Sequence, residues 1–483
     1  MKLDEYASYD GLGLGALVAM GEVSPTELAR TAASAIEAAN GDVKAVIETY
    51  ADRIDDLDES TLGHGPFRGV PFLMKDVFGH EQGRLIEFGS RLCRGMTVTT
   101  STYFADQLKA AGVNILGRSA APEYSMSATT ESVMFGNTSN PWKKGYSAGG
   151  SSGGAQAAVT SGMVPIAHGS DIGGSIRIPA SWCGGVGLKP SRGRVSIGPV
   201  ADEGGLGFSA NHIQAKTVRD AATMLDWVSK PQIGDPFVIP RPSQSYASYV
   251  NAPIPRLKIG IVLTELFGVP VDPEVAQAVK DTGKMLAGMG HHVDIAEADF
   301  GGIATLHKIN DLFFFGFDGR LDGYAARTGQ KAGPDTLEPV ILSVYEFAKQ
   351  ITPARFFAAI SEVNVARRNL ARFYADHDVW LSPTTARVSE PWGKYHLSKT
   401  GADASSLVEK LFKEPCQFTV PHNIMGTPGL SLPLAMHSTG VPIGVQLAGR
   451  PAEEHVLIGL AGALEHAMPW ARRVPEIHVS RVK

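Results

Sequence analysis

The chain has 483 residues, 43% of them hydrophobic and 19% charged, so it can bury a large core and by length alone could form two or three domains. Its formal net charge is −5 and its lysines and arginines are scattered, which argues against a nucleic-acid partner. No apolar run reaches the roughly 18 residues of a membrane span, and residues 1–6 lack the pattern of a secretory signal. We therefore expect a cytoplasmic protein with no membrane partner.

The predicted elements alternate between helices and strands along the chain. Ser24, with Pro25 after it and Glu27 three residues on, forms a capping box that predicts a helix to about Asn40. The apolar patterns that follow predict strands at 43–50, 113–117, 257–263, 292–296 and 379–381, and helices at 101–111, about 273–288 and about 353–375. This alternation predicts an α/β fold with a mixed, largely parallel sheet covered by helices. Residues 233–255, rich in proline and serine, predict a surface excursion.

Two serines stand in glycine-rich segments, Ser151 after Gly149 and Gly150, and Ser175 after two further glycines. Paired glycines let the backbone turn sharply with its N–H groups facing inward, which predicts an oxyanion hole. The helix-forming run 155–159 places Ser151 at a helix N-terminus, whose positive end would face the site. With Lys75 earlier in the chain, these residues are the material for a serine hydrolase with a lysine base.

The order of these motifs resembles the amidase signature family. It runs from Gly-Val-Pro-x-x-x-Lys-Asp at 69–76, through 135–142 and Gly-Gly-Ser-Ser-Gly-Gly at 149–154, to Asp-x-Gly-Gly-Ser-x-Arg-x-Pro at 171–179. The similarity continues through 183–190 to 440–446, so it covers nearly the whole chain. It implies a single amidase domain, 1–483, around a twisted sheet of about eleven strands, with a catalytic core at roughly 65–215.

The resemblance also implies a role for each motif residue. Ser175 is the nucleophile, Lys75 the base, and Ser151 the bridge that passes the proton between them. The oxyanion would be bound by the backbone N–H groups of Ile172, Gly173, Gly174 and Ser175. The peptide bond between Gly150 and Ser151 is cis in the family, and by motif position the acyl pocket is bordered by Ser125, Met126 and Ser127. Asp171 and Arg177 either support the loop or form an ordinary structural ion pair.

A lysine base must be neutral before it can accept a proton. The pKa of Lys75, ordinarily near 10.4, must therefore fall toward neutral pH. Burial and a nearby helix N-terminus both act in that direction.

Other motif matches are weaker. Residues 149–153 also match Gly-x-Ser-x-Gly, the nucleophile elbow of α/β-hydrolases, but that motif needs a strand directly before the serine, and residues 142–147 are polar and broken by glycine. The glycines at 11–15 hint at a dinucleotide loop, but no apolar strand precedes them, so a helix start is favoured. His291 and His292 have no third ligand at metal spacing, and three dispersed cysteines, Cys93, Cys183 and Cys416, predict buried free thiols. We expect no metal and no cofactor.

The leading function is a stand-alone amidase for small, uncharged, partly apolar amides. Carbamates and cyclic or linear amide oligomers are further substrates to consider, because residues 167–171 and 191–194 are similar to the 6-aminohexanoate cyclic dimer hydrolase branch of the family. A glutaminase subunit of a tRNA-dependent amidotransferase and a catalytically silent binding protein are the alternatives. A homodimer is compatible with the sequence.

One aromatic cluster has two interpretations. Its members, Phe313, Phe314, Phe315 and Phe317, could wall the pocket, but four aromatic side chains at this spacing cannot all face one cavity, and core packing is favoured.

Overall fold

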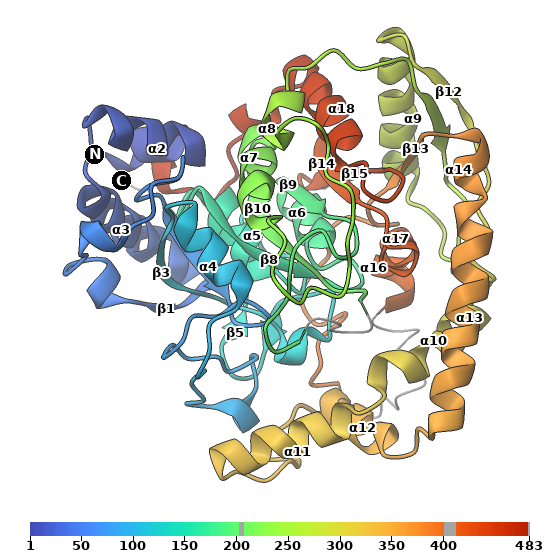
Figure 1. The fold of residues 1–483 in the computed structure, drawn as a ribbon, viewed down its shortest axis with the longest axis horizontal. Helices are drawn as coiled ribbons and strands as arrows, with labels where there is room; N and C mark the ends of the chain where they lie inside the picture. The colour runs from blue at the N-terminus through green and yellow to red at the C-terminus, as the bar shows by residue number, and fades with distance from the viewer. Residues whose placement is uncertain (202–206, 400–411, 482–483) are drawn as a thin grey trace.

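A large twisted sheet forms the centre of the protein (Figure 1). The structure, a computed structural model, describes residues 1–201, 207–399 and 412–481. The sheet has eleven strands in the order β1-β3-β2-β8-β10-β9-β14-β15-β13-β11-β12. Their bounds are β1 Val46–Thr49, β2 Pro71–Lys75, β3 Asn114–Ser119, β8 Ile166–Asp171, β9 Val186–Lys189, β10 Ala210–Ala215, β11 Lys258–Ile261, β12 His292–Ile295, β13 Val379–Pro383, β14 Gly429–Met436 and β15 Pro442–Ala448. The predicted eleven-stranded, mixed α/β sheet is confirmed.

The prediction of a largely parallel sheet is wrong. Six of the ten neighbouring pairs are antiparallel and four are parallel. Parallel pairs occur where the chain returns after a helix, as in β2 with β3 and β11 with β12. In the middle of the sheet β10 pairs antiparallel with both of its neighbours, and β14 and β15 form an antiparallel pair. These pairs join segments that are distant or not predicted, and the local residue pattern of a strand does not indicate whether its neighbour runs parallel or antiparallel.

Two small sheets lie outside the main one. They are formed by β4 Glu131–Ser132 with β5 Gly136–Asn137, and by β6 Ser139–Asn140 with β7 Lys143–Ser147. The strand β7 corrects the sequence interpretation of residues 142–147 as strand-free. It pairs with β6 and forms one isolated bridge, from Tyr146 to Pro391, and it does not join the central sheet as the strand of a nucleophile elbow would.

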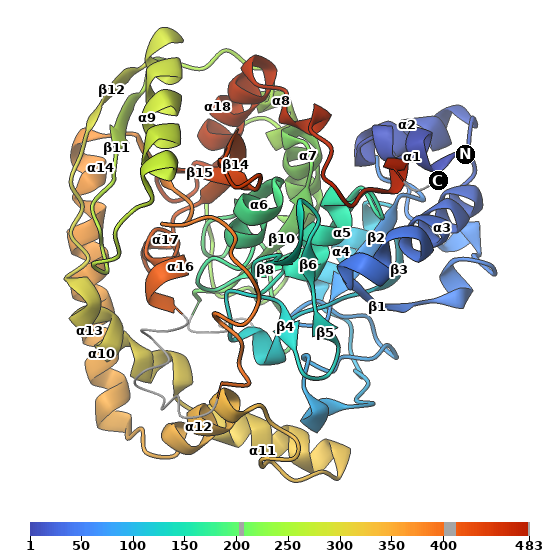
Figure 2. The ribbon, with the colours of Figure 1, turned by 180° about the vertical axis from the view of Figure 1, so that it is seen from behind.

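Helices flank the sheet and extend well beyond it (Figures 1 and 2). Their bounds are α1 Leu3–Ser8, α2 Gly11–Met20, α3 Pro25–Val43, α4 Tyr103–Ala110, α5 Gly153–Thr160, α6 Arg177–Cys183, α7 Val218–Val228, α8 Tyr246–Tyr249, α9 Pro273–Gly288, α10 Gly302–Phe314, α11 Phe317–Thr328, α12 Pro339–Ala348, α13 Pro353–Ala371, α14 Phe373–Asp376, α16 Glu414–Cys416, α17 Val420–Met425 and α18 Glu454–Ala467. No helix in the described ranges is long and apolar enough to cross a membrane.

Local signals in the sequence located some of these elements. The Ser24 hydroxyl accepts the Glu27 N–H at 3.0 Å and starts α3, as the capping box predicted. The five predicted strands correspond to β1, β3, β11, β12 and β13, and the remaining predicted helices to α4, α9 and α13 with α14. The glycines at 11–15 start the helix α2, which Asp10 caps. Residues 233–255 are mostly exposed and contain the short helix α8.

Apolar side chains gather in two large buried clusters. One covers the sheet and includes the interiors of β2, β3 and β8. The other fills the space among α10, α11, α12 and α13 and includes Trp182 of α6 and Trp380 of the sheet strand β13. In Figure 1 these four helices, drawn in yellow and orange, lie along the lower and right edges, away from α5.

Candidate active site

Lys75 is the last residue of β2, and its side chain is buried. The strand β2 runs parallel to β8, so the carboxyl ends of the two strands meet. The Lys75 Nζ donates to the Ser151 Oγ at 2.7 Å and to the Ser170 Oγ at 2.9 Å. Burial lowers the pKa of Lys75 to about 7, although the charge of Asp171 acts in the opposite direction. A neutral amine, able to take a proton, is therefore available near physiological pH.

Ser151 lies just before α5, whose N-cap residue is Ser152. The peptide bond between Gly150 and Ser151 is cis. A Cβ atom at Gly150 would lie 2.5 Å from the carbonyl oxygen of Thr129, so the position accepts no side chain. The close approach of these two backbones places Ser151 beside Lys75.

Ser175 follows the loop after β8 and is half-buried. Its carbonyl oxygen accepts the Ser152 N–H at 3.2 Å, which ties the two serine segments together. Ser151 and Ser175 both line one cavity. No hydrogen bond joins their two hydroxyls, which both belong to the described part of the chain. The three side chains that the sequence singled out are thus gathered in one place.

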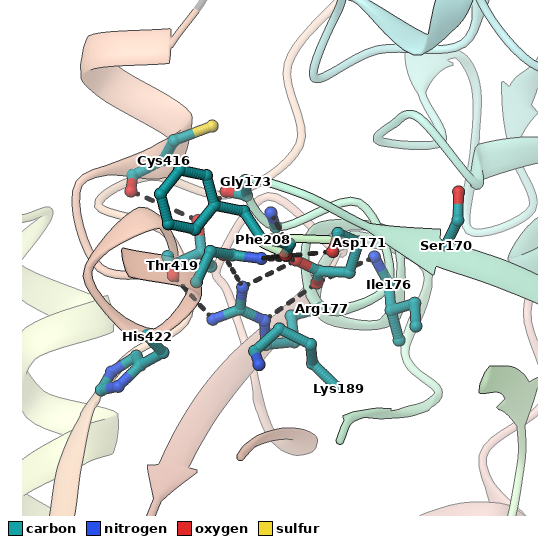
Figure 3. Close-up of polar contacts among 12 residues, drawn as sticks. Ser170, Asp171, Gly173, Ile176, Arg177, Lys189, Phe208, Cys416, Thr419 and His422 are labelled. Carbon is teal, nitrogen blue, oxygen red and sulfur yellow. Dashed lines mark hydrogen bonds and ion pairs between the residues drawn. The ribbon is translucent and has the colours of Figure 1, made fainter. Parts of the chain in front are cut away.

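A buried ionic network holds the loop that carries Ser175 (Figure 3). Arg177 donates to both carboxylate oxygens of Asp171, at 2.9 and 2.8 Å, and both side chains are fully buried. Asp171 in turn accepts the N–H groups of Gly174 at 2.9 Å and Ile176 at 3.2 Å. Burial opposes ionisation of Asp171, but the contact with Arg177 outweighs it and lowers the pKa of this carboxyl below its ordinary value. The pair therefore supports the loop.

The far side of Arg177 is fixed by a distant segment of the chain. Its guanidinium donates to the Thr419 carbonyl at 2.9 Å and to the Asn423 side chain at 2.7 Å. The Thr419 hydroxyl donates to the Gly173 carbonyl at 2.6 Å (Figure 3). Thr419, directly before α17, is thereby bonded both to Arg177 and to the backbone of the loop that carries Ser175.

The four backbone N–H groups expected to bind an oxyanion are not equivalent. That of Gly174 donates to Asp171, whereas those of Ile172, Gly173 and Ser175 donate to no residue that the structure describes. Three donors are thus available around Ser175, and the fourth serves the loop.

The cavity next to these residues has a volume of about 510 Å³. Ser125, Met126 and Ser127, expected at the acyl pocket, all line it. The Ser127 hydroxyl donates to the Tyr395 carbonyl at 2.8 Å, whereas the buried Ser125 Oγ has no hydrogen-bond partner among the described residues. A volume of this size is typical of a site for a small organic molecule.

The aromatic cluster is divided between two environments. Phe313, Phe314 and Phe317 line the cavity, and Phe314 and Phe317 are at the same time buried members of the apolar cluster among the helices, so core packing and the cavity wall are both correct for them. Phe315 points elsewhere and stacks on Phe356 at a centroid distance of 4.4 Å. The prediction that four aromatic side chains at this spacing cannot all face one cavity is confirmed, since Phe315 does not line it.

Ser170 was missed at the sequence level although it contacts the lysine. The only signal was its place beside Asp171 at the end of a motif, in a strand that the sequence analysis did not predict. Thr419 was missed because nothing near it in the sequence resembles a site. In the described ranges no group of three or more His, Cys, Asp or Glu side chains could hold a metal ion, and the three cysteines are buried.

Comparisons with known proteins give one consistent result. The model of the family described as Amidase matches residues 27–458. The chain is 34% identical over 478 residues to the 6-aminohexanoate-cyclic-dimer hydrolase of Paenarthrobacter ureafaciens, covering 97% of this chain and 96% of that protein. It is 31% identical to a glutamyl-tRNA(Gln) amidotransferase subunit of Synechococcus, covering 94% and 96%. A solved structure of a 6-aminohexanoate cyclic dimer hydrolase complexed with substrate superposes with a TM-score of 0.92 at 33% identity, covering 98% of this chain and 99% of that one. The chain therefore belongs to the amidase signature family.

Proposed function

We propose that the protein hydrolyses the C–N bond of small, uncharged amides through an acyl-enzyme on Ser175. The observation that carries this proposal is the 2.7 Å contact from the Lys75 Nζ to the Ser151 Oγ, beside a cavity that Ser175 also lines. A serine hydroxyl is a weak nucleophile and needs a neighbouring base. Lys75, with its pKa lowered to about 7 by burial, supplies one.

The reaction begins with a proton transfer along three side chains. Ser175 gives its proton to Ser151 as Ser151 gives its own to the neutral Lys75. The Ser175 Oγ bonds to the substrate carbonyl carbon, and the negative charge that develops on the carbonyl oxygen is bound by the free N–H groups of Ile172, Gly173 and Ser175. Each such donor typically contributes about 10²–10³ in rate.

Collapse of the tetrahedral intermediate breaks the C–N bond. The proton held by Lys75 returns through Ser151 to the departing nitrogen, so the leaving group departs as a neutral amine. Water then attacks the ester on Ser175 by the same proton path, which releases the acid and restores the enzyme.

The walls of the cavity favour an apolar substrate over glutamine. Aromatic and aliphatic side chains supply most of its lining, among them Phe88, Tyr124 and Phe313. Glutamine also carries an α-ammonium group, and no Asp or Glu among the described residues lines the cavity to pair with it. We therefore place the amidotransferase role second, behind a stand-alone hydrolase of linear or cyclic amides or carbamates acting on a small molecule in the cytoplasm.

The test uses the purified chain without a partner. A fluorophosphonate should label Ser175, located by peptide mapping, and an aryl amide should be hydrolysed at a rate that Ser175→Ala abolishes. An adduct on Ser151 would instead favour the nucleophile-elbow interpretation, in which Ser151 is the nucleophile. Amide hydrolysis only after addition of partner subunits would favour the amidotransferase role.

A further inference from the structure

Thr130 is a fully buried residue directly before β4, and its hydroxyl lies against the segment that carries Ser151. The Thr130 Oγ1 donates to the Gly149 carbonyl at 2.9 Å and accepts the Gly153 N–H at 3.0 Å. A threonine hydroxyl can do both, because it has one proton to donate and lone pairs that accept. The two backbone groups stand two residues before and two residues after Ser151. One hydroxyl therefore spans the turn that holds this serine.

The same hydroxyl caps the helix α5. The Gly153 N–H is the first of this helix, and the first N–H groups of a helix have no carbonyl partner within it. An N-cap side chain normally supplies an acceptor for one of them. Here the N-cap residue is Ser152, and its side chain accepts from none of the N–H groups in the described first turn. Thr130, 23 residues earlier in the chain than Gly153, supplies an acceptor instead.

The local backbone is shaped to admit this hydroxyl. A Cβ atom at Gly153 would lie 2.4 Å from the Thr130 Oγ1, so a side chain at this position would displace the hydroxyl. At the other end of the turn, the Gly149 N–H donates to the Ser147 Oγ at 3.1 Å. Both polar groups of the Gly149 backbone are therefore bound by hydroxyls, and Ser151 follows two residues later.

The position of Ser151 is critical for the proton path. Its Oγ accepts from the Lys75 Nζ at 2.7 Å, and a proton can pass only between groups within hydrogen-bond reach. A misplacement of about 1 Å can lower a rate by about 100-fold. Without the Thr130 hydroxyl, two buried backbone groups, the Gly149 carbonyl and the Gly153 N–H, would lose this partner. The turn would then relax toward other partners, because an unpaired buried polar group is costly.

We propose that Thr130 is a positioning residue, whose hydroxyl binds both ends of the turn and so holds the Ser151 Oγ between Lys75 and Ser175. This inference rests on the proposed function, in which Ser151 passes the proton. Thr130 is not among the described residues that line the cavity. It therefore acts on turnover through Ser151 and not on substrate binding.

The test compares variants of Thr130 with and without a hydroxyl. Thr130→Val has nearly the same shape and lacks the hydroxyl, whereas Thr130→Ser keeps it. On one anilide, kcat should fall about 10-fold or more in Thr130→Val with KM within about twofold of the wild type, and Thr130→Ser should keep kcat within about threefold. Thr130→Ala repeats the loss of the hydroxyl without the second methyl group of valine. The matched control is Thr282→Val, which removes a buried hydroxyl that donates to the Ala278 carbonyl within α9 and should leave kcat unchanged.

A Ser151→Ala background separates positioning from a general structural role. The readout is the rate at which an activated ester acylates Ser175, because its leaving group departs without a proton. Thr130→Val should lower this rate about 5-fold or more when Ser151 is present. In the Ser151→Ala enzyme the same change should cost less than about twofold, because the hydroxyl that Thr130 positions is already gone.

Several results would overturn the role of Thr130 and leave amide hydrolysis intact. One is an equal loss from Thr130→Val with and without the Ser151 hydroxyl. Another is a loss that Thr130→Ser does not restore. If Thr130→Val and Thr130→Ala both fail to fold while Thr130→Ser folds, the hydroxyl serves stability and not positioning. No Ser175-dependent hydrolysis of the anilide or the ester by the wild type would overturn the proposed function and this inference with it.

Discussion

The ammonium nitrogen of Lys75 and the hydroxyl of Ser170 lie 2.9 Å apart, inside the protein and on neighbouring parallel strands. Ser170 thus gives the lysine a second partner besides Ser151. Since the strands β2 and β8 are fixed by the sheet, this contact orients the amine toward the proton path.

Removing the Ser170 hydroxyl should affect chemistry more than binding. We expect Ser170→Ala to lower kcat about 5- to 10-fold, which corresponds to one neutral hydrogen bond, and to leave KM nearly unchanged. The alkaline-rising limb of the pH–rate profile should also move to lower pH, because the charged amine loses an acceptor and its pKa falls. The control is Ser161→Ala, a buried serine whose hydroxyl donates to the carbonyls of Ala157 and Ala158 in its own helix region. An unshifted limb would show that Ser170 is only structural.

The pH dependence of the native protein should follow Lys75. Because burial lowers the pKa of Lys75 to about 7, and because only the neutral amine acts as a base, kcat/KM for an amide should rise with a midpoint near pH 7 and level off above it. His80 also lines the cavity, and burial lowers its pKa from the ordinary value. The rise of kcat/KM with pH should persist in His80→Gln. Loss of this rise in the variant would show that the His80 imidazole, and not Lys75, is the titrating group.

Lys75 and Ser151 should behave as one unit in a double-mutant cycle. Lys75→Met and Ser151→Ala should each lower kcat/KM by orders of magnitude, because both interrupt the same proton path. The double variant should then be hardly worse than the less active single variant. Losses that add fully, measured on one amide with intact folding by circular dichroism, would leave Ser151 without a part in proton transfer.

The buried arginine beside the site should matter for stability. Arg118 donates to Asp76 at 2.6 Å and to Glu87 at 2.9 Å, and all three side chains are nearly inaccessible to solvent. Arg118→Met leaves buried carboxylates unpaired, so we expect the free energy of unfolding to fall by about 3–5 kcal/mol. The control Arg84→Met breaks the more exposed pair with Asp52, which should cost at most about 1 kcal/mol. Equal losses in thermal unfolding would contradict this reasoning.

Charge at the edge of the cavity should discriminate between charged analogues. Arg320 and Arg327 lie seven residues apart on α11, hence on one helix face, and both line the cavity, whereas no Asp or Glu does so among the described residues. An amide with a remote carboxylate should therefore be hydrolysed more efficiently than its ammonium counterpart. The difference should shrink as salt is raised and in Arg320→Gln combined with Arg327→Gln. A preference for the ammonium substrate would contradict the predicted effect of Arg320 and Arg327.

Local signals in the sequence located what depends on local chemistry. The capping box at Ser24 and the paired glycines before Ser151 and Ser175 act through their own backbones, so their consequences were predictable. The need for a lowered pKa at Lys75 followed from its chemistry, and the structure supplies the burial that lowers it.

What the sequence could not give depends on contacts between distant segments. The antiparallel direction of β10 is set by pairing with β8 and β9, and the support that Thr419 gives to Gly173 spans 246 residues. The separate role of the Gly174 N–H follows from the exact position of the Asp171 carboxylate. No periodicity in the sequence reports such positions.

The helices α10 to α13 lie apart from the strands that hold Lys75 and Ser170 (Figure 2). One cavity wall, at residues 306–327, thus comes from a different stretch of the gene than the reacting groups at 75–175, although the second stretch also supplies lining residues such as Phe88 and Tyr124. Mutations can accumulate in the first stretch without disturbing the proton path. Directed evolution confined to residues 306–327 should therefore yield enzymes with new amide preferences and an unchanged pH–rate profile.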